Sequence, residues 1–431
     1  MAHTELSRTP SGDGNRKTYT ISFWVKRSEL GTQNILFSVN GGTNNTNYME
    51  MSFNGSDQLL IGGYTSNFLT TNRKFRDPSA WYHIVWRVDT TQSTADDRFR
   101  LYVNGTQETS FSTRNNPGQN DDTAANMAAS TKIGQTLDGY LAQYIMADGQ
   151  SYAPTTFGST DSNGVWVPIT SPSVTYGTNG FKLDFNLSGT SADASGFGAD
   201  SSGQGNHFAS NNLQTNPNTK DTPHNLFCTL NNVDTESVEL SKGGCDFDSS
   251  GGSAEGVRAT MGVLAGKWYY ECKITGSAGL SAGNIGYSQS TMKLNANPRG
   301  GQCMVINGSS SVNFYNFSSS AVVLDASNGI GQNDIIGVAL NLTDNQITFY
   351  KNGAQIGSTQ SIASGLLQGD FFIPCVFDDG GVNDVVGSFN FGNPTFTIAS
   401  SNSDANGHGS FEYAVPSGYY ALCTKNLATY G

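Results

Sequence analysis

Aromatic and amide side chains gather in one short stretch of the sequence. Asn313 and Asn316 lie beside Tyr315 and Phe317 in the run VNFYNF. An aromatic face can stack on a sugar ring or a peptide, and a neighbouring amide can donate and accept hydrogen bonds. The combination therefore suits a small binding site for a sugar or a peptide. Packing of the two rings within a sheet is the structural alternative.

Hydrolysis of a glycosidic bond would need different side chains. Two carboxylates must face each other across the bond, and on a strand they would form a Glu-x-Asp-x-Glu run or a close variant. The sequence has no such run, and Glu29, Glu50 and Glu108 stand alone, as surface charges do. We therefore expect no catalytic residue and no enzymatic activity, with a glycan-degrading enzyme as the weaker alternative.

A histidine and three tryptophans could also take part in a site. His83 lies in an apolar run with no second histidine near it in sequence, so a structural role is favoured over metal binding. Trp24, Trp81 and Trp86 could form a platform for a sugar, but tryptophans on the strands of a sandwich more often belong to the core. We assign none of the four to a site.

No cofactor is expected, although calcium stays an alternative. Asp138 and Asp148 flank predicted strands, but no Asp-x-Asn array accompanies them, so a metal site is not assigned. The cysteines are irregularly spaced without a Cys-x-x-Cys pair, which indicates neither zinc nor redox chemistry. Buried free thiols are expected at Cys228, Cys245, Cys272, Cys303, Cys375 and Cys423.

Composition and charge limit both the partners and the fold. A formal charge of −12 and a pI of about 4.8 disfavour nucleic acid and anionic membranes as partners, because both are themselves negative. No signal peptide and no apolar run long enough to cross a bilayer is recognised, so we expect synthesis in the cytoplasm and no membrane insertion. The 51 glycines and the charged fraction of 13% are typical of short strands joined by tight turns.

The strands of the first half follow from alternation. Residues 19–26 read YTISFWVK and alternate between two faces, as a β-strand does. Gly-Gly, Asn-Asn and Asn-Gly pairs separate the runs that follow, at intervals typical of a sandwich. These further strands are expected at residues 34–39, 48–53, 58–61, 81–88 and 98–103.

A hairpin organises the second half. Residues 334–353 read DIIGVALNLTDNQITFYKNG, in which a β-branched run, a Thr-Asp-Asn turn and a second run are closed by Asn352-Gly353, a pair that tolerates positive φ. Further strands are expected at residues 237–240, 256–261, 266–274, 284–287, 302–306, 311–317, 371–376 and 388–392.

The connection between the halves is rich in Ser, Gly, Asn and Asp. Residues 159–225 nevertheless contain short strand candidates, so we interpret them as an ordered bridge. The loop DSSGQGN at residues 200–206 is expected to be an Asx-turn staple between two strands rather than an ion site.

Two family resemblances extend this interpretation. The runs ISFWVK, WYHIVWRVD, FRLYVNG and KIGQTLDGYLAQYIMADG make residues 18–157 similar to the laminin-G-like, concanavalin A-like jelly roll. The DIIGV strand followed by FYKNG resembles the signature of the SPRY domain, a β-sandwich binding module, and that resemblance extends over residues 255–423. In such domains ligands are held by loops at one end of the sandwich.

The SPRY resemblance marks three loops, at residues 288–299, 309–320 and 378–384. It adds Asp378, Asp379 and Asn383 to the candidate site already formed by the amides and aromatics of residues 313–317. Ile285 stands where the family usually has an aromatic residue, so the type of ligand cannot be carried over from animal relatives.

These observations predict an all-β chain with two antiparallel β-sandwich (jelly-roll) domains. A Gly/Ser/Asn-rich ordered bridge joins them. The expected order is an N-terminal segment at 1–17, a laminin-G-like sandwich at 18–158, the bridge at 159–254 and a SPRY-like sandwich at 255–431.

The order of these parts, together with the opening LSRTPS and GNRKT, resembles structural proteins of marine bacteriophages. The resemblance implies a virion protein, a fibre or adhesin subunit of tail or head that contacts host-surface carbohydrate and other virion proteins. Because one shallow sugar site binds weakly, a homo-oligomer is expected, a trimer anchored by its N-terminal segment. A capsid decoration protein without a ligand is the alternative.

Overall fold

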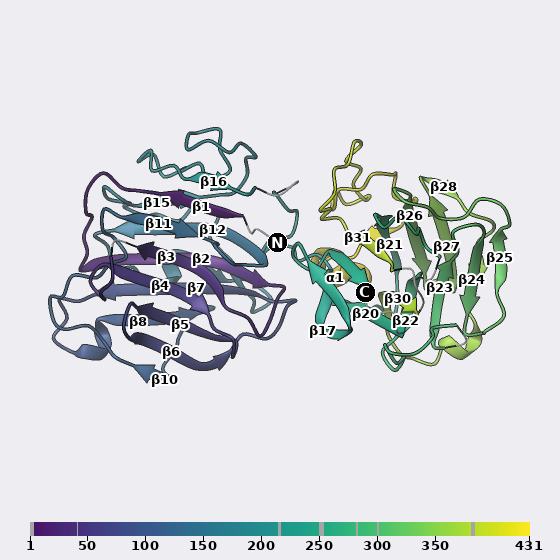
Figure 1. Ribbon diagram of the computed structural model, residues 1–431, viewed down its shortest axis with the longest axis horizontal. Helices are drawn as coiled ribbons and strands as arrows, with labels where there is room; N and C mark the ends of the chain where they lie inside the picture. Colours follow the sequence, from purple (N-terminus) through teal and green to yellow (C-terminus); the bar gives the residue numbers. More distant parts are fainter. Residues whose placement is uncertain are drawn as a thin grey trace. The chain divides into compact units, whose positions relative to one another are not determined.

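The computed structural model of the chain (Figure 1) describes residues 4–40, 42–213, 217–249, 254–281, 283–299, 301–380 and 384–431. The chain divides into two units, Met1–Asn218 and Thr219–Gly431. The strands pair antiparallel, apart from β32 (Tyr420–Ala421), which runs parallel to β21 (Lys267–Ile274). The predicted all-β fold class with antiparallel sandwiches is confirmed.

Helix contributes little to the described ranges. Their one α-helix is α1 (Thr424–Tyr430), and three short 3-10 turns accompany it. None of the helices in these ranges has the length and apolar character needed to cross a membrane.

The described residues of the first unit form two large sheets and one two-stranded sheet. The eight-stranded sheet has the order β10-β6-β5-β4-β3-β11-β1-β16, and the six-stranded sheet has the order β15-β12-β2-β7-β8-β9. The strands of the larger sheet are β1 (Glu5–Arg8), β3 (Asn34–Asn40), β4 (Tyr48–Phe53), β5 (Gln58–Gly63), β6 (Asn67–Lys74), β10 (Phe111–Arg114), β11 (Ser130–Ile133) and β16 (Ala209–Asn211). Those of the smaller sheet are β2 (Thr18–Arg27), β7 (Trp81–Asp89), β8 (Phe99–Val103), β9 (Thr106–Gln107), β12 (Gly139–Asp148) and β15 (Phe181–Leu183).

Strand β2 shows why this unit packs as it does. Alternate residues of a strand share one face, and the odd-numbered apolar residues of β2 all lie in the core without exposure. Among them, the ring of Phe23 stacks on Tyr144 at 4.7 Å, and Tyr19 meets Trp86 edge to face at 5.6 Å. Trp86 is therefore a core residue, as a strand tryptophan is expected to be.

His83 has the structural role that the sequence favours. Its Nδ1 accepts the indole N–H of Trp166 at 2.9 Å, so its Nε2–H donates to the Ser22 hydroxyl at 2.9 Å. Its ring stacks on Trp24 at 4.6 Å. Burial lowers the pKa of His83 to about 3, because a charged ring at this position would be shielded from water without a counter-charge.

The segments expected to lie outside the first sandwich are largely built into it. β1 lies between β11 and β16, β15 pairs with β12, and β13 (Gly158–Thr160) and β14 (Trp166–Pro168) form a hairpin. The division between the units therefore falls at Asn218, inside the expected bridge. Turn-rich composition does not reveal that three-residue strands within it pair at sheet edges.

The Asx-turn staple predicted in this region is confirmed. Asp200 Oδ1 accepts the backbone N–H groups of Lys182 and Ser202, both at 2.9 Å. Its Oδ2 accepts the N–H of Asn206 at 2.8 Å. The loop is thereby fastened to β15.

The second unit also contains two sheets. One has the order β17-β20-β30-β22-β23-β24-β25, and the other has the order β18-β19-β31-β21-β26-β27-β28, with β29 on β27 and β32 on β21. The first comprises β17 (Leu230–Glu236), β20 (Ala254–Ala259), β22 (Gly283–Gln289), β23 (Cys303–Asn307), β24 (Val312–Asn316), β25 (Val322–Asp325) and β30 (Phe372–Asp379). The second adds β18 (Val238–Ser241), β19 (Asp246–Ser249), β26 (Ile335–Asn341), β27 (Gln346–Lys351), β28 (Ala354–Gln355), β29 (Gln360–Ser361) and β31 (Val386–Asn390).

Both outer faces of the second unit carry an apolar layer besides the core. On the seven-stranded sheet, Cys303, Val305, Cys375 and Phe377 pack with Met292 from the loop that follows β22. On the other sheet, Tyr269 and Ala339 pack against residues of the C-terminal segment. All six cysteines are buried free thiols, as predicted.

Candidate functional site

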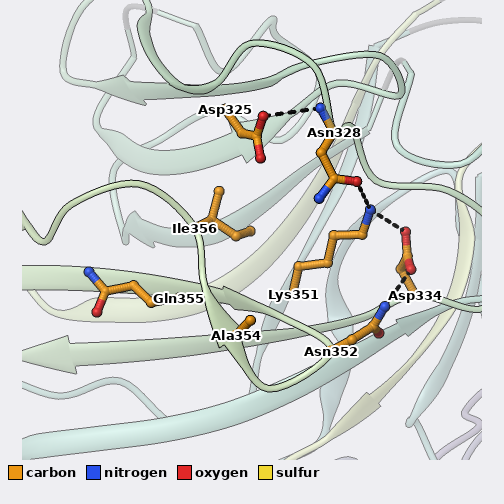
Figure 2. A pocket seen from close by; sticks show the side chains of 8 residues that line it. All are labelled: Asp325, Asn328, Asp334, Lys351, Asn352, Ala354, Gln355 and Ile356. Atoms are coloured by element: carbon orange, nitrogen blue, oxygen red, sulfur yellow. Dashed lines mark hydrogen bonds and ion pairs between the residues drawn. The ribbon is translucent and has the colours of Figure 1, made fainter.

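A polar cleft of about 300 Å³ lies at one end of the second unit. It is formed where β25 ends, β26 begins and the chain turns between β27 and β28 (Figure 2). Its lining residues are Asp325, Asn328, Asp334, Lys351, Asn352, Ala354, Gln355 and Ile356.

Lys351 holds one wall of this cleft together. Its Nζ donates to Asn328 Oδ1 at 2.8 Å and to the carbonyl of Gly329 at 2.6 Å, and it forms an ion pair with Asp334 Oδ2 at 3.2 Å (Figure 2). An ammonium group has three N–H donors, so all are used within the wall. Lys351 is therefore a positioning residue for Asn328.

Asp334 completes the same network. Burial acts to raise its pKa, but hydrogen bonds from the Gly331 N–H, Asn352 and Lys351 outweigh burial and lower the pKa. Asn352 donates to Asp334 Oδ1 at 2.7 Å and accepts the N–H of Ile335 at 2.9 Å. The wall consequently carries an ionised carboxylate at neutral pH.

Three polar atoms of the lining remain available to a ligand. Asp325 Oδ1 accepts two backbone N–H groups of its own turn, both at 3.0 Å, whereas its Oδ2 has no partner among the described residues. Asn328 Nδ2 and Gln355 Oε1 are likewise unpaired within the described ranges. Ile356 adds an apolar side chain that is 5% exposed. The cleft thus offers hydrogen-bond acceptors, a donor and an apolar contact in a small volume.

The hairpin of β26 and β27 brings the wall residues together. Ile336 pairs with Lys351 across the two strands, so the residue before β26 and the residues after β27 meet at one end. Asn352 adopts φ 50° and Gly353 φ 80°, the left-handed conformation that an Asn-Gly turn tolerates. In the sequence alone, this stretch indicates only a fold signature. The signal that could indicate a site is the acid and the lysine at matching ends of the hairpin, Asp334 and Lys351.

Arg299, which does not belong to the predicted set, connects two residues that do, Tyr315 and Asp379. The guanidinium carbon of Arg299 lies 5.3 Å above the ring of Tyr315, and the same guanidinium pairs with Asp379. Tyr315 is 9% exposed beneath this contact. Burial and the charge of Asp378 raise the pKa of Asp379, and Arg299 opposes them. Tyr315 consequently offers no open face for stacking.

Asn316 and Phe317 follow Tyr315 at the end of β24. The Asn316 amide donates to the Ser361 carbonyl at 2.8 Å and accepts the Ala363 N–H at 3.1 Å, so it joins two strands. Phe317 is 43% exposed. This is the one aromatic of the predicted set with an open face.

The remaining predicted residues are spread over the sheet. Asn313 is half-buried on β24 and donates to Ser311 at 3.3 Å. Asp378 is 6% exposed and accepts the Ser249 hydroxyl at 2.7 Å. Asn383 lies outside the described residues. The described members of the predicted set therefore lie on or beside two strands, β24 and β30, which β22 and β23 separate in the sheet.

The described ranges contain no group of three or more His, Cys, Asp or Glu side chains placed to hold a metal ion. Asp148, considered for calcium, accepts the Asn15 N–H at 2.7 Å, the Asn126 amide at 2.6 Å and the Asn179 N–H at 3.0 Å. Its two oxygens serve to join the loops around β12.

Comparison with known families agrees with this architecture. Residues 3–148 match the concanavalin A-like lectin/glucanases superfamily, and residues 267–394 match the SPRY domain. The first unit thus carries a concanavalin A-like domain and the second a SPRY domain, two folds that fit a binding role. No curated protein matches the chain.

Solved structures similar to the chain include three SPRY domains. The SPRY domain of human HERC1 is 17% identical with a TM-score of 0.32, covering 37% of this chain and 96% of its own. The TRIM65 PSpry domain is 16% identical with a TM-score of 0.30 and coverages of 38% and 88%. A human SPRY domain is 15% identical with a TM-score of 0.28 and coverages of 36% and 96%.

Proposed function

We propose that this chain is a non-enzymatic binding protein that contacts carbohydrate through the polar cleft of its SPRY unit. The observation that carries the proposal is the set of unpaired atoms in the cleft, Asp325 Oδ2, Asn328 Nδ2 and Gln355 Oε1. Sugar hydroxyls both donate and accept hydrogen bonds, so they complement a lining that mixes acceptors with a donor.

The proposed setting is a virion. The protein acts there as a fibre or adhesin subunit of tail or head, attached to other virion proteins and touching host-surface carbohydrate. The domain combination supports this setting, because it resembles that of phage structural proteins and pairs a lectin-like fold with a second binding fold. A small polar cleft binds weakly, so several copies act together on one surface.

Titration calorimetry with a panel of neutral and acidic oligosaccharides tests the cleft. We expect at least one sugar to bind the wild-type chain, and Asp325→Asn combined with Asn328→Ala to weaken binding ~10- to 100-fold, as the loss of hydrogen bonds that include a charged acceptor predicts. Asp344→Asn is the matched control, since its side chain is 55% exposed in the turn at the far end of the β26–β27 hairpin.

Three results would count against the proposal. Equal affinity of the double variant and the control would show that the cleft is not the site. Release of reducing sugar by the purified protein, lost on changing one carboxylate, would make it an enzyme. A decoration protein would bind none of the sugars and would still bind the particle.

A further inference from the structure

Strand β25 is an open edge of the seven-stranded sheet. Among the described strands only β24 pairs with it, and Val322 and Val323 are 49% and 56% exposed. Successive residues of a strand point to opposite faces, so an apolar side chain is exposed on each side of this edge. Within the described residues, no backbone group of 322–324 has a hydrogen-bond partner beyond the β24 ladder.

Proteins usually protect such an edge with charged residues, proline, a bulge or a covering segment. The run SSSAVVL at residues 318–324 has neither a charge nor a proline. The register with β24 shifts between Val323 and Asp325, so Leu324 lies at a bulge, and the backbone of Gly357 lies against it. Val322 and Val323 stay in register with Phe314 and Asn313, so this exposed part of the edge is regular.

The opposite edge of the same sheet shows what protection looks like. β17 exposes Val233 at 60%, yet the next residue, Asp234, is held by Arg258 in a two-point ion pair at 2.8 and 2.9 Å. The register of β17 with β20 is also broken between Leu230 and Thr235. An added strand would meet charge and irregular backbone along β17, whereas β25 is uncharged and in regular register at Val322 and Val323.

We propose that β25 pairs antiparallel with β25 of a second copy of this chain, joining two seven-stranded sheets across a twofold axis. The edge leaves Val322 and Val323 without a partner strand on one side, and the uncharged run fits a partner strand that is also uncharged and apolar. A second copy supplies such a strand, and residues 318–324 hold no charge that would repel the same run of the other copy.

The register follows from the same chemistry. With Val323 on the axis, the two Val323 residues face each other, and the two Asp325 carboxylates stay apart. Such an isologous contact closes at two copies, so the edge favours a dimer over the trimer expected from the sequence. This inference does not depend on sugar binding in the cleft.

Sedimentation velocity between about 1 and 100 μM tests the pairing on the full chain. We expect wild-type dimers, at least tenfold weaker dimerisation for Val323→Lys, and no change for Val233→Lys on the protected edge. Circular dichroism confirms that both variants are folded. A wild-type monomer at the highest concentration, a trimer, or equal effects of the two variants would overturn the proposal.

A disulfide trap gives a second measurement. Directly opposed residues of an antiparallel pair lie within disulfide reach, so Val323→Cys should cross-link two copies on mild oxidation. The six native cysteines are buried and give little background. Val233→Cys is the control and should stay uncross-linked. Failure of the Val323→Cys chain to cross-link, while wild type dimerises, would show that the dimer uses another surface.

Sugar binding by the monomeric Val323→Lys variant is expected to persist at each cleft, so this result and a failure of the proposed function remain distinguishable.

Discussion

One buried charge from each unit shows two ways in which the chain buries charge. In the first unit a buried arginine is paired with a carboxylate, so opposite charges compensate each other. In the second unit a buried glutamate accepts hydrogen bonds from neutral groups alone. Removing one partner of a buried ion pair is strongly destabilising, because the other charge is left uncompensated. The ionisation of a solitary carboxylate depends instead on its hydrogen-bond donors and on pH.

Arg27 and Asp57 form the pair of the first unit. Their side chains are 0% and 5% exposed and join at 3.1 Å, and the guanidinium also donates to the Phe75 carbonyl at 2.8 Å. Burial acts to raise the pKa of Asp57, but hydrogen bonds from the Gly31 N–H, Arg76 and Arg27 lower it overall. Asp57 is thus ionised and supplies the counter-charge of the Arg27 guanidinium.

Glu271 is the example of a solitary carboxylate from the second unit. It accepts the backbone N–H groups of Glu412 and Tyr413, both at 2.9 Å, and the Asn390 amide at 3.0 Å. Burial raises its pKa despite these donors. Glu271 therefore fastens the C-terminal segment to the outer face of β21.

The largest predicted effect comes from breaking the pair. Asp57→Ala leaves Arg27 buried without a counter-charge and should lower the free energy of unfolding of the first unit by ~3–5 kcal/mol. Hydrogen exchange read by mass spectrometry measures it in the peptides of β2 and β5 and separates the two units. Arg76→Ala is the control, because that side chain is 56% exposed and should cost no more than about 1 kcal/mol. Similar losses for both variants would contradict the compensation argument.

Much of this architecture could be predicted, because it depends on local alternation. The expected strand at residues 19–26 is β2 with one residue more at each end, and β4 has the expected bounds. Pairing over long sequence distances could not be predicted: the expected bridge supplies β15 and β16, and the N-terminal segment supplies β1.

The site shows the same limit. The sequence marks Tyr315 as a candidate aromatic face, but nothing local indicates that Arg299 from a separate loop covers it. The cleft is built from residues that a fold signature already explained, Asp334 and Lys351 among them. Which face a strand residue takes is local information, whereas what covers that face is not.

The next effect is a response to pH that differs between the units. The pKa of His83 is about 3 in the folded state, below its ordinary value of 6.5. The unfolded chain therefore takes up a proton first as pH falls, and the stability present above pH 6.5 is lost towards pH 3. The expected slope is ~1.4 kcal/mol per pH unit, or about 3 kcal/mol at pH 4.

The second unit should respond in the opposite direction over part of this window. The raised pKa of Glu271 means that its folded state takes up a proton before the unfolded chain does, so its contribution becomes more favourable as pH falls towards 4.5. Exchange at pH 6.5, 5.5 and 4.5 measures both units in one sample. His83→Gln should flatten the slope in the first unit only. An unchanged slope in that variant would assign the effect to another group.

A smaller loss is expected from Glu271→Gln. The substitution keeps the size of the side chain but removes the charge and one of the two acceptor oxygens, so a backbone N–H of residues 412–413 loses its partner. The predicted cost is ~2 kcal/mol, confined to the C-terminal segment and β21. Faster proteolysis within residues 393–431, with unchanged exchange in the core strand β22, would support this. Glu239→Gln on the exposed edge strand β18 should have no effect.

The smallest predicted effect replaces a hydroxyl that fastens β19. Ser249 Oγ donates to Asp378 at 2.7 Å and accepts the Val385 N–H at 2.8 Å, so a neutral group here links a buried carboxylate to the backbone. Ser249→Ala leaves Asp378 with the Gly380 N–H at 3.0 Å and should cost about 1 kcal/mol in the peptides of β19 and β30. The cost is smaller than that of Asp57→Ala because no unpaired charge is created; the carboxylate keeps one donor and lies near the end of its strand.

Since Asp378 also belongs to the set marked by the SPRY resemblance, the same variant should be assayed for sugar binding. A loss of affinity larger than the loss of stability would place Asp378 in a ligand site, and unchanged affinity would leave it the fastening role that the geometry gives it.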